Sequence, residues 1–214
     1  MRRHSPGLPL QPWLLVTGAT GGGADRRVQH PPARRRHDAL PPDRPNNAAS
    51  EPTGGERLLR VKRIELARYL DVEGIVMQTS DVAVRAARNH LWAEDLAAQL
   101  HRDLRQRLAE QLDGVRVLGP DQRLRAPERE IMELTVTIDR FQGRFDGYAV
   151  VGGKWELLDS GGEIQAGKRF QRQQALAQDG YPALVETLKD AWISVVADIA
   201  NGLRGAWADD DPAG

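Results

Sequence analysis

Two histidines in the regular part of the sequence, His90 and His101, are the side chains best suited to bind a metal ion or to move a proton near neutral pH. Their separation of eleven residues would place them about three helical turns apart if one helix held both. A zinc-binding pair on a helix prefers a spacing of four residues. We therefore expect each histidine to be a surface or boundary residue, and we expect no metal site.

Carboxylate and hydroxyl groups are also spaced poorly for catalysis. Glu94 and Asp95 are adjacent, so their side chains would diverge on a helix. The aspartates at 209–211 lie near the C-terminus, where a charge run is typical of a solvated tail. The serines beyond residue 55 are Ser80, Ser160 and Ser194. None of these serines lies in a Gly-x-Ser-x-Gly turn, so the sequence predicts no catalytic residues and no enzyme.

A glycine-rich segment at residues 14–23, LLVTGATGGG, is similar to the phosphate-binding turn of short-chain dehydrogenases. Such a turn needs a helix directly after it, because the pyrophosphate lies at the helix N-terminus. Here Pro31 and Pro32 interrupt the segment that follows, and no second strand with a ribose-binding acid comes after them. No tyrosine has a lysine four residues later, as that family requires. We therefore expect no nicotinamide cofactor, and no other cofactor.

The composition excludes several further classes of protein. The 214 residues include 30 Lys and Arg against 30 Asp and Glu, so no broad cationic field is available to attract nucleic acid. Cysteine is absent, which excludes disulfides, thiolate catalysis and cysteine-ligated metals. No run of about 18 apolar residues predicts a transmembrane helix.

The neutral total conceals two different kinds of sequence that meet at residue 55. Residues 1–55 contain 9 of the 13 prolines, 8 arginines against 4 acidic residues and no lysine, whereas the remainder contains 22 basic and 26 acidic residues. Such a segment cannot bury enough apolar surface to offset the entropy of ordering it. We predict a disordered tail over 1–55, for which a mistranslated reading frame is a second interpretation. One domain is expected over 56–205, followed by an acidic tail over 206–214.

Two segments have the apolar spacing of amphipathic helices. Residues 91–112 contain no Gly or Pro, and leucines recur at every fourth position from Leu96 to Leu112. Residues 181–203 keep apolar side chains at i, i+3, i+4 and i+7 for six turns, with Pro182 suited to the first turn. Each helix needs an apolar surface of similar length to cover.

Alternating apolar and polar residues predict strands in the rest of the domain. The segments before the first helix are 57–67, 74–79 and 82–85, and those after it are 115–118, 132–139, 149–157 and 164–172. The last three strands are joined by short turns and are expected to form an antiparallel meander. We therefore predict a two-layer α+β domain in which two long amphipathic helices pack on a mainly antiparallel sheet, in the order β-β-β-α-β-β-β-β-α.

Aromatic side chains supply the candidates for a binding surface. Trp155 and Trp192 fall on the apolar faces of predicted elements, so we expect both in the core. Tyr69, Leu70 and Trp92 instead open or close predicted elements, and no inward period fixes them. Trp92 in particular is expected to open the first helix. Because a few aromatic and apolar side chains dominate most interfaces, we take these three as candidate partner-binding residues.

Several short motifs occur in a fixed order along the domain. They are ARYLD at 67–71, TSD at 79–81, HLWAEDL at 90–96, FQG at 141–143, GYAV at 147–150, WELLD at 155–159 and YPALV at 181–185. On these motifs, residues 56–203 resemble the PqiC-like family of ABC-type transport auxiliary lipoproteins. The resemblance implies a non-enzymatic periplasmic domain, held to the outer membrane by a lipidated cysteine. It also implies an MCE-domain protein as partner in intermembrane lipid transport, and leaves a homo-oligomer open.

The front of the chain departs from the family pattern. A lipoprotein begins with a short basic stretch, an apolar segment and a small-residue box that ends in cysteine. In this sequence Pro9, Gln11 and Pro12 interrupt the apolar stretch, and no cysteine follows. We therefore expect neither a signal peptide nor a lipid anchor within these residues, and take the outer-membrane location from the family alone.

A periplasmic lipid carrier is the alternative function. A carrier needs an apolar cavity of several hundred cubic ångströms between its helices and its sheet. The tryptophans and leucines on the facing surfaces predict a filled core instead, which favours an accessory subunit that docks on other proteins.

Overall fold

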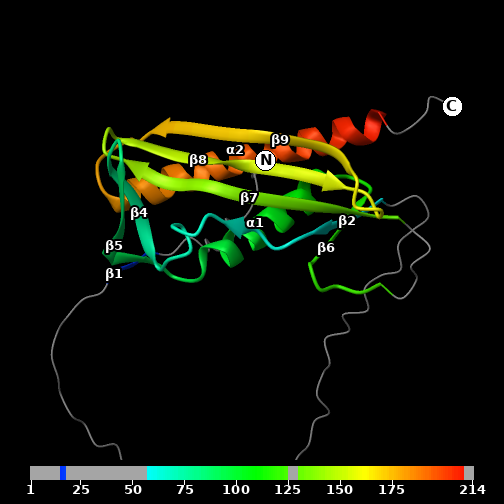
Figure 1. Ribbon diagram of the computed structural model, residues 1–214, viewed down its shortest axis with the longest axis horizontal. Coiled ribbons are helices and arrows are strands. Elements are labelled where there is room, and N and C mark those ends of the chain that lie inside the picture. Colours follow the sequence, from blue (N-terminus) through cyan, green and yellow to red (C-terminus); the bar gives the residue numbers. More distant parts are fainter. Residues whose placement is uncertain (1–14, 18–56, 125–129, 210–214) are drawn as a thin grey trace, which may run out of the picture.

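The computed structural model describes residues 15–17, 57–124 and 130–209 (Figure 1). Their elements, in chain order, are β1 (Leu15–Thr17), β2 (Arg57–Val61), β3 (Glu65–Leu66), β4 (Gly74–Ser80), β5 (Ala83–Trp92), α1 (Leu96–Gln111), β6 (Val115–Leu118), β7 (Ile131–Arg144), β8 (Tyr148–Leu158), β9 (Ile164–Ala175) and α2 (Tyr181–Asp209).

The long strand β7 organises the sheet. Along one edge it pairs antiparallel with β8, which pairs antiparallel with β9, so the predicted meander is confirmed. Along its other edge β2, β3 and β4 pair with it in parallel, one after another. Beyond them β6 pairs with β2 at one edge, and β5 pairs with β4 and, on its other side, with the edge strand β1. The sheet is therefore mixed, with its longest ladders antiparallel.

Both helices lie on one face of this sheet, behind the long strands in Figure 1. α2 packs across β7, β8 and β9, and α1 packs beside α2 and against β6. The predicted two-layer α+β architecture is confirmed. Trp155 in β8 is 4% exposed and Trp192 in α2 is fully buried, so both predicted core positions are confirmed. The leucine stripe of α1 is buried as its spacing predicts.

The first helix begins later than the apolar spacing predicts. The prediction placed Trp92 in its first turn, but β5 continues through Trp92, whose backbone N–H donates to the Glu73 carbonyl at 2.9 Å. Asp95 is the N-cap, because its carboxylate accepts from the Ala98 N–H at 2.7 Å. Pairing with β4 thus holds this segment extended until a capping residue starts the helix at Leu96.

The predicted strand over 57–67 is in fact two strands, and with β1 this makes five strands before α1 where three were predicted. β2 ends at Val61, and β3 resumes at Glu65 beside a later part of β7. Between them the Lys62 N–H donates to the Leu134 carbonyl at 2.9 Å. The chain therefore follows β7 but leaves the regular ladder for three residues.

Most of the predicted tail over 1–55 lies outside the described residues. The exception is β1, which pairs antiparallel with the end of β5 and places Leu15 opposite Trp92. At the other end of the chain α2 continues to Asp209, beyond the predicted domain boundary at 205.

No helix in the described ranges is long and apolar enough to cross a membrane.

Candidate functional site

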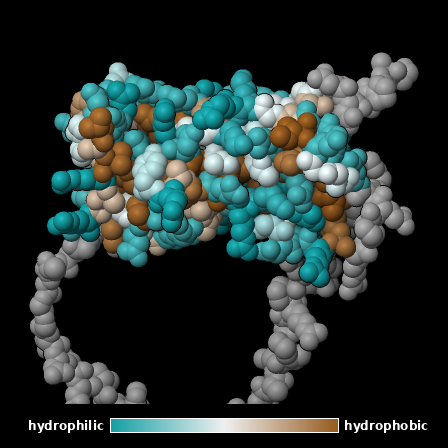
Figure 2. All heavy atoms as spheres, in the orientation of Figure 1, coloured by the Kyte–Doolittle hydropathy of each residue, from teal (hydrophilic) through white to brown (hydrophobic). Residues whose placement is uncertain are grey.

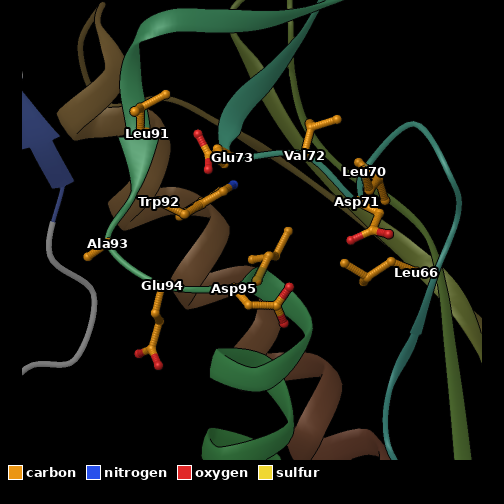
Figure 3. A pocket seen from close by; sticks show the side chains of 11 residues that line it. Leu66, Leu70, Asp71, Val72, Glu73, Leu91, Trp92, Ala93, Glu94 and Asp95 are labelled. Carbon is orange, nitrogen blue, oxygen red and sulfur yellow. The ribbon is translucent and has the colours of Figure 1, made fainter.

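A groove with a volume of about 530 Å³ opens between the β3–β4 connection and the junction of β5 with α1 (Figure 3). Trp92 lies on one side of it, and Leu66 and Leu70 lie on the other. We call it the Trp92 groove. Its residues come from two segments, 66–73 and 91–96, that the sheet brings together because β4 and β5 form an antiparallel pair.

Apolar side chains form part of the wall of the Trp92 groove. The indole ring of Trp92 is partly buried and packs on Phe141, with ring centroids 5.9 Å apart and planes inclined at 55°. Leu70 is 1% exposed and Leu96 is 4% exposed, so both belong to the core and present only a small surface to the groove. An apolar side chain of a partner could therefore extend the packing around Trp92 without displacing the fold.

Four carboxylates surround these apolar walls: Asp71, Glu73, Glu94 and Asp95. Arg102 donates two hydrogen bonds to Glu94, one of them at 2.8 Å, and these bonds lower the pKa of the Glu94 carboxyl. Asp95 is occupied as the α1 cap. Asp71 and Glu73 are exposed, and neither side chain has a hydrogen-bond or ion-pair partner among the described residues. The rim thus carries negative charge that suits a cationic ligand.

A second groove, of about 480 Å³, lies beside Tyr69 on the sheet. The Tyr69 hydroxyl lies 2.8 Å from both the Asp139 carbonyl and Gln142 Oε1, and it can donate to one of them at a time. Burial, with the charge of Asp139 second, raises the pKa of the Tyr69 phenol. The phenol therefore stays protonated and serves as a hydrogen-bond donor.

Comparison with known proteins identifies the family. The model of the ABC-type transport auxiliary lipoprotein component matches residues 39–200. The intermembrane transport lipoprotein PqiC of Escherichia coli K12 is 37% identical over 150 residues, which cover 70% of this chain and 76% of PqiC. PqiC of Shigella flexneri matches equally well. The chain belongs to the ABC-type transport auxiliary lipoprotein family.

Solved structures share the fold of this chain. A crystal structure of an uncharacterized protein has 35% sequence identity and a TM-score of 0.60, and the match covers 69% of this chain and 92% of that one. A crystal structure of a protein from Xanthomonas campestris has a TM-score of 0.62 at 16% identity, covering 78% of this chain and 94% of the other. The second likeness concerns the fold alone. The resemblance drawn from the short motifs is thus confirmed.

The structure places the three candidate binding residues of this family member in two neighbouring grooves. Leu70 and Trp92 face the Trp92 groove, and Tyr69, which is 37% exposed, lines the second groove. Leu70 is a core residue rather than an exposed anchor, because β3 and β4 hold it inward. The acidic rim was missed by reasoning from the sequence. The motif ARYLD already contains Asp71, but only the fold shows that it lies near Glu94.

The two histidines occupy separate environments. The His90 ring stacks on Tyr181, with centroids 4.0 Å apart. His101 Nε2 lies 3.3 Å from the Val61 carbonyl, and burial lowers the pKa of its imidazole. Within the described ranges, no three acidic or histidine side chains are grouped in a way that could hold a metal ion.

The glycine-rich segment is used differently from a dehydrogenase fingerprint. Its residues Leu15–Thr17 form β1, an edge strand antiparallel to β5. A dinucleotide-binding strand instead lies within a parallel sheet and leads directly into a helix. The remaining residues of the motif lie outside the described part of the chain.

Proposed function

We propose that this chain is a non-enzymatic accessory component of an ABC/MCE-type system that transports lipid between envelope membranes. It acts by docking on an MCE-domain protein at the periplasmic face of the outer membrane. Membership of the auxiliary lipoprotein family and the 37% identity to PqiC support the transport role. The Trp92 groove is the observation that supports docking, because it combines an aromatic wall with two exposed carboxylates that have no partner in the described part of the chain.

The chemistry of the groove defines the partner segment that it fits. An apolar side chain could pack against Trp92, while a neighbouring Lys or Arg could pair with Asp71 or Glu73. Hot spots at interfaces commonly combine a desolvated aromatic centre with a polar surround. The docking segment is therefore a short stretch of the MCE partner that carries apolar and basic residues. Tyr69 contributes from the adjacent groove.

The lipid carrier is the weaker alternative. An acyl chain would have to lie between the helices and the sheet, where Trp155, Leu188 and Trp192 are 4%, 0% and 0% exposed. These buried side chains already occupy the layer where an acyl chain would have to lie. The grooves near Trp92 and Tyr69 lie at the surface instead.

The test is an association measurement between the full-length chain and its cognate MCE protein. Replacing Trp92 with Ala, or Asp71 and Glu73 together with Lys, should weaken association more than about tenfold. A double variant at Glu163 and Glu186, both changed to Lys, makes the same change in net charge on exposed positions away from the groove. This control should associate normally.

Two results would contradict the proposal. Equal weakening by the control would mean that net charge, rather than the groove, sets the affinity. Stoichiometric phospholipid carried through purification by a monomer that binds no MCE protein, seen by native mass spectrometry, would favour the carrier.

A further inference from the structure

Three exposed apolar side chains of the domain lie at one end of the sheet. Val82 is 97% exposed and Val84 is 46% exposed at the turn between β4 and β5, and Phe145 is 52% exposed at the turn between β7 and β8. Figure 2 shows apolar side chains at the left end of the molecule, where these turns lie in Figure 1. We call these three residues the apolar turn end.

Strand pairing places the two turns side by side. β4 and β7 run parallel, with Gln78 opposite Arg144, so both strands end at the same edge of the domain. Val82, Val84 and Arg144 line one groove, which confirms that the turns meet. The apolar turn end thus brings together exposed side chains from two adjacent turns. Exposed apolar side chains beside cationic ones suit the interface of a membrane that contains anionic lipids.

Arginines flank this apolar surface. Arg85 follows Val84 in β5, and its side chain has no carboxylate partner among the described residues. Arg140 donates to the neutral Gln171 side chain at 2.9 Å, and within the described ranges it also has no carboxylate partner. Arg144 pairs with Asp146 at 2.6 Å. With Asp81 as the other acidic residue, the set carries a net positive charge, unlike the acidic rim of the Trp92 groove.

We propose that the apolar turn end contacts the surface of a lipid bilayer that contains anionic headgroups. Val82 and Phe145 enter the interface between headgroups and acyl chains, while Arg85 and Arg140 pair with lipid phosphates. This orients the domain with the turns of β4–β5 and β7–β8 toward the membrane. The inference does not rest on the Trp92 groove, since it uses different residues of opposite charge; Tyr69 alone of the docking candidates shares a groove with Val82 and Val84.

The absence of cysteine from the sequence allows a site-specific test. Full-length Val82→Cys is labelled with the environment-sensitive fluorophore NBD and mixed with excess vesicles of phosphatidylethanolamine and phosphatidylglycerol. NBD emission should shift to shorter wavelength and increase several-fold. Ile164→Cys is the matched control, because Ile164 is 61% exposed at the opposite end of the sheet, where β9 begins. Its label should not respond.

Charge and apolar contact are then separated. Vesicles of phosphatidylcholine alone should give a much smaller response from the Val82 label. Arg85→Gln, introduced into the labelled chain, should weaken binding to the anionic vesicles about fivefold. This factor corresponds to about 1 kcal/mol, the typical contribution of one arginine near an anionic surface. Phe145→Glu should abolish the response, whereas Ile164→Glu should leave it unchanged.

Three outcomes would overturn the proposal. The first is that the Val82 label does not respond to anionic vesicles. The second is that the Ile164 label responds as strongly as the Val82 label. The third is that the Val82 label responds to the MCE protein and not to vesicles. The first outcome would leave the docking proposal standing, because association with the MCE protein is measured without lipid.

Discussion

Gly202 of α2 lies against the indole ring of Trp155 in β8. A Cβ atom added at Gly202 would lie 2.8 Å from Cη2 of that ring and closer still to Cζ2. The ring is buried and cannot move aside, so the absence of a side chain at residue 202 is what allows α2 to lie close to the sheet.

Gly202→Ala should therefore lower stability. Overpacking in a filled core costs about 1–3 kcal/mol, which offsets the gain in helix propensity. Gly205 is the matched control on the same helix, because a Cβ there would meet nothing within 4 Å. Gly205→Ala should raise stability by about 0.4–1 kcal/mol. Thermal unfolding of the two variants should thus shift in opposite directions, and a shift in the same direction would contradict the packing described.

Burial of His101 should make stability depend on pH. Because the pKa of the folded imidazole lies below its ordinary value, the unfolded chain binds more protons near pH 6.5. The contribution of His101 is therefore fully present above that range, and it is lost as pH falls through about 6.5 toward the lowered folded pKa.

Denaturant unfolding at pH values between 8 and 5, spaced about half a unit apart, measures how the unfolding free energy depends on pH. The difference in unfolding free energy between the native chain and His101→Gln isolates the imidazole from other titrating groups. A difference that grows in favour of the native chain as the solution becomes more acidic would contradict the sign.

Asp95 should act as a cap of α1 as well as a groove residue. Asp95→Ala removes the hydrogen bond to the Ala98 N–H and should cost about 0.5–2 kcal/mol. Asp95→Asn keeps a capping oxygen and should retain most of the stability. Chemical denaturation compares the two variants, and equal losses would show that the charge rather than the cap matters.

Substitutions at Leu70 and Val72 should show which side chain of the β3–β4 connection contributes to stability through packing. Leu70 is 1% exposed, so Leu70→Ala should cost about 2–5 kcal/mol through the cavity that it leaves. Val72 is 40% exposed, and Val72→Ala should stay within about 0.5 kcal/mol. The denaturant midpoints of the two variants measure the loss of stability. Similar losses would contradict the burial of Leu70 and the exposure of Val72.

The sequence was sufficient for the parts of the fold that depend on local period. The leucines of α1 and the apolar face of α2 follow from helical spacing alone, and the meander of β7, β8 and β9 follows from alternation and short turns. The start of α1 did not follow, because Leu91 and Trp92 fit a helix as well as a strand. Their conformation is decided by pairing with β4, near Glu73.

The parallel strand pairs could not be predicted from local sequence patterns either. Leu58 pairs with Ile131, and no feature near either residue indicates that register. The Trp92 groove depends on strand pairing too, since the segments that carry Asp71 and Glu94 line one groove only when β4 and β5 form their antiparallel pair. The aromatic candidates could be selected from the sequence by residue type, but the acidic residues that surround Trp92 in the structure could not be predicted.

The central position of β7 also determines when the domain can be completed during synthesis. β2, β3 and β4 all precede α1, yet each pairs along one edge with β7, which ends at Arg144. At typical elongation rates of about 5–20 residues per second, the last of these strands waits about 3–13 s for its neighbour. During that time an exposed strand edge faces the crowded surroundings of the ribosome. A nascent chain that stalls before β7 should therefore be a stronger chaperone substrate than one that stalls after it.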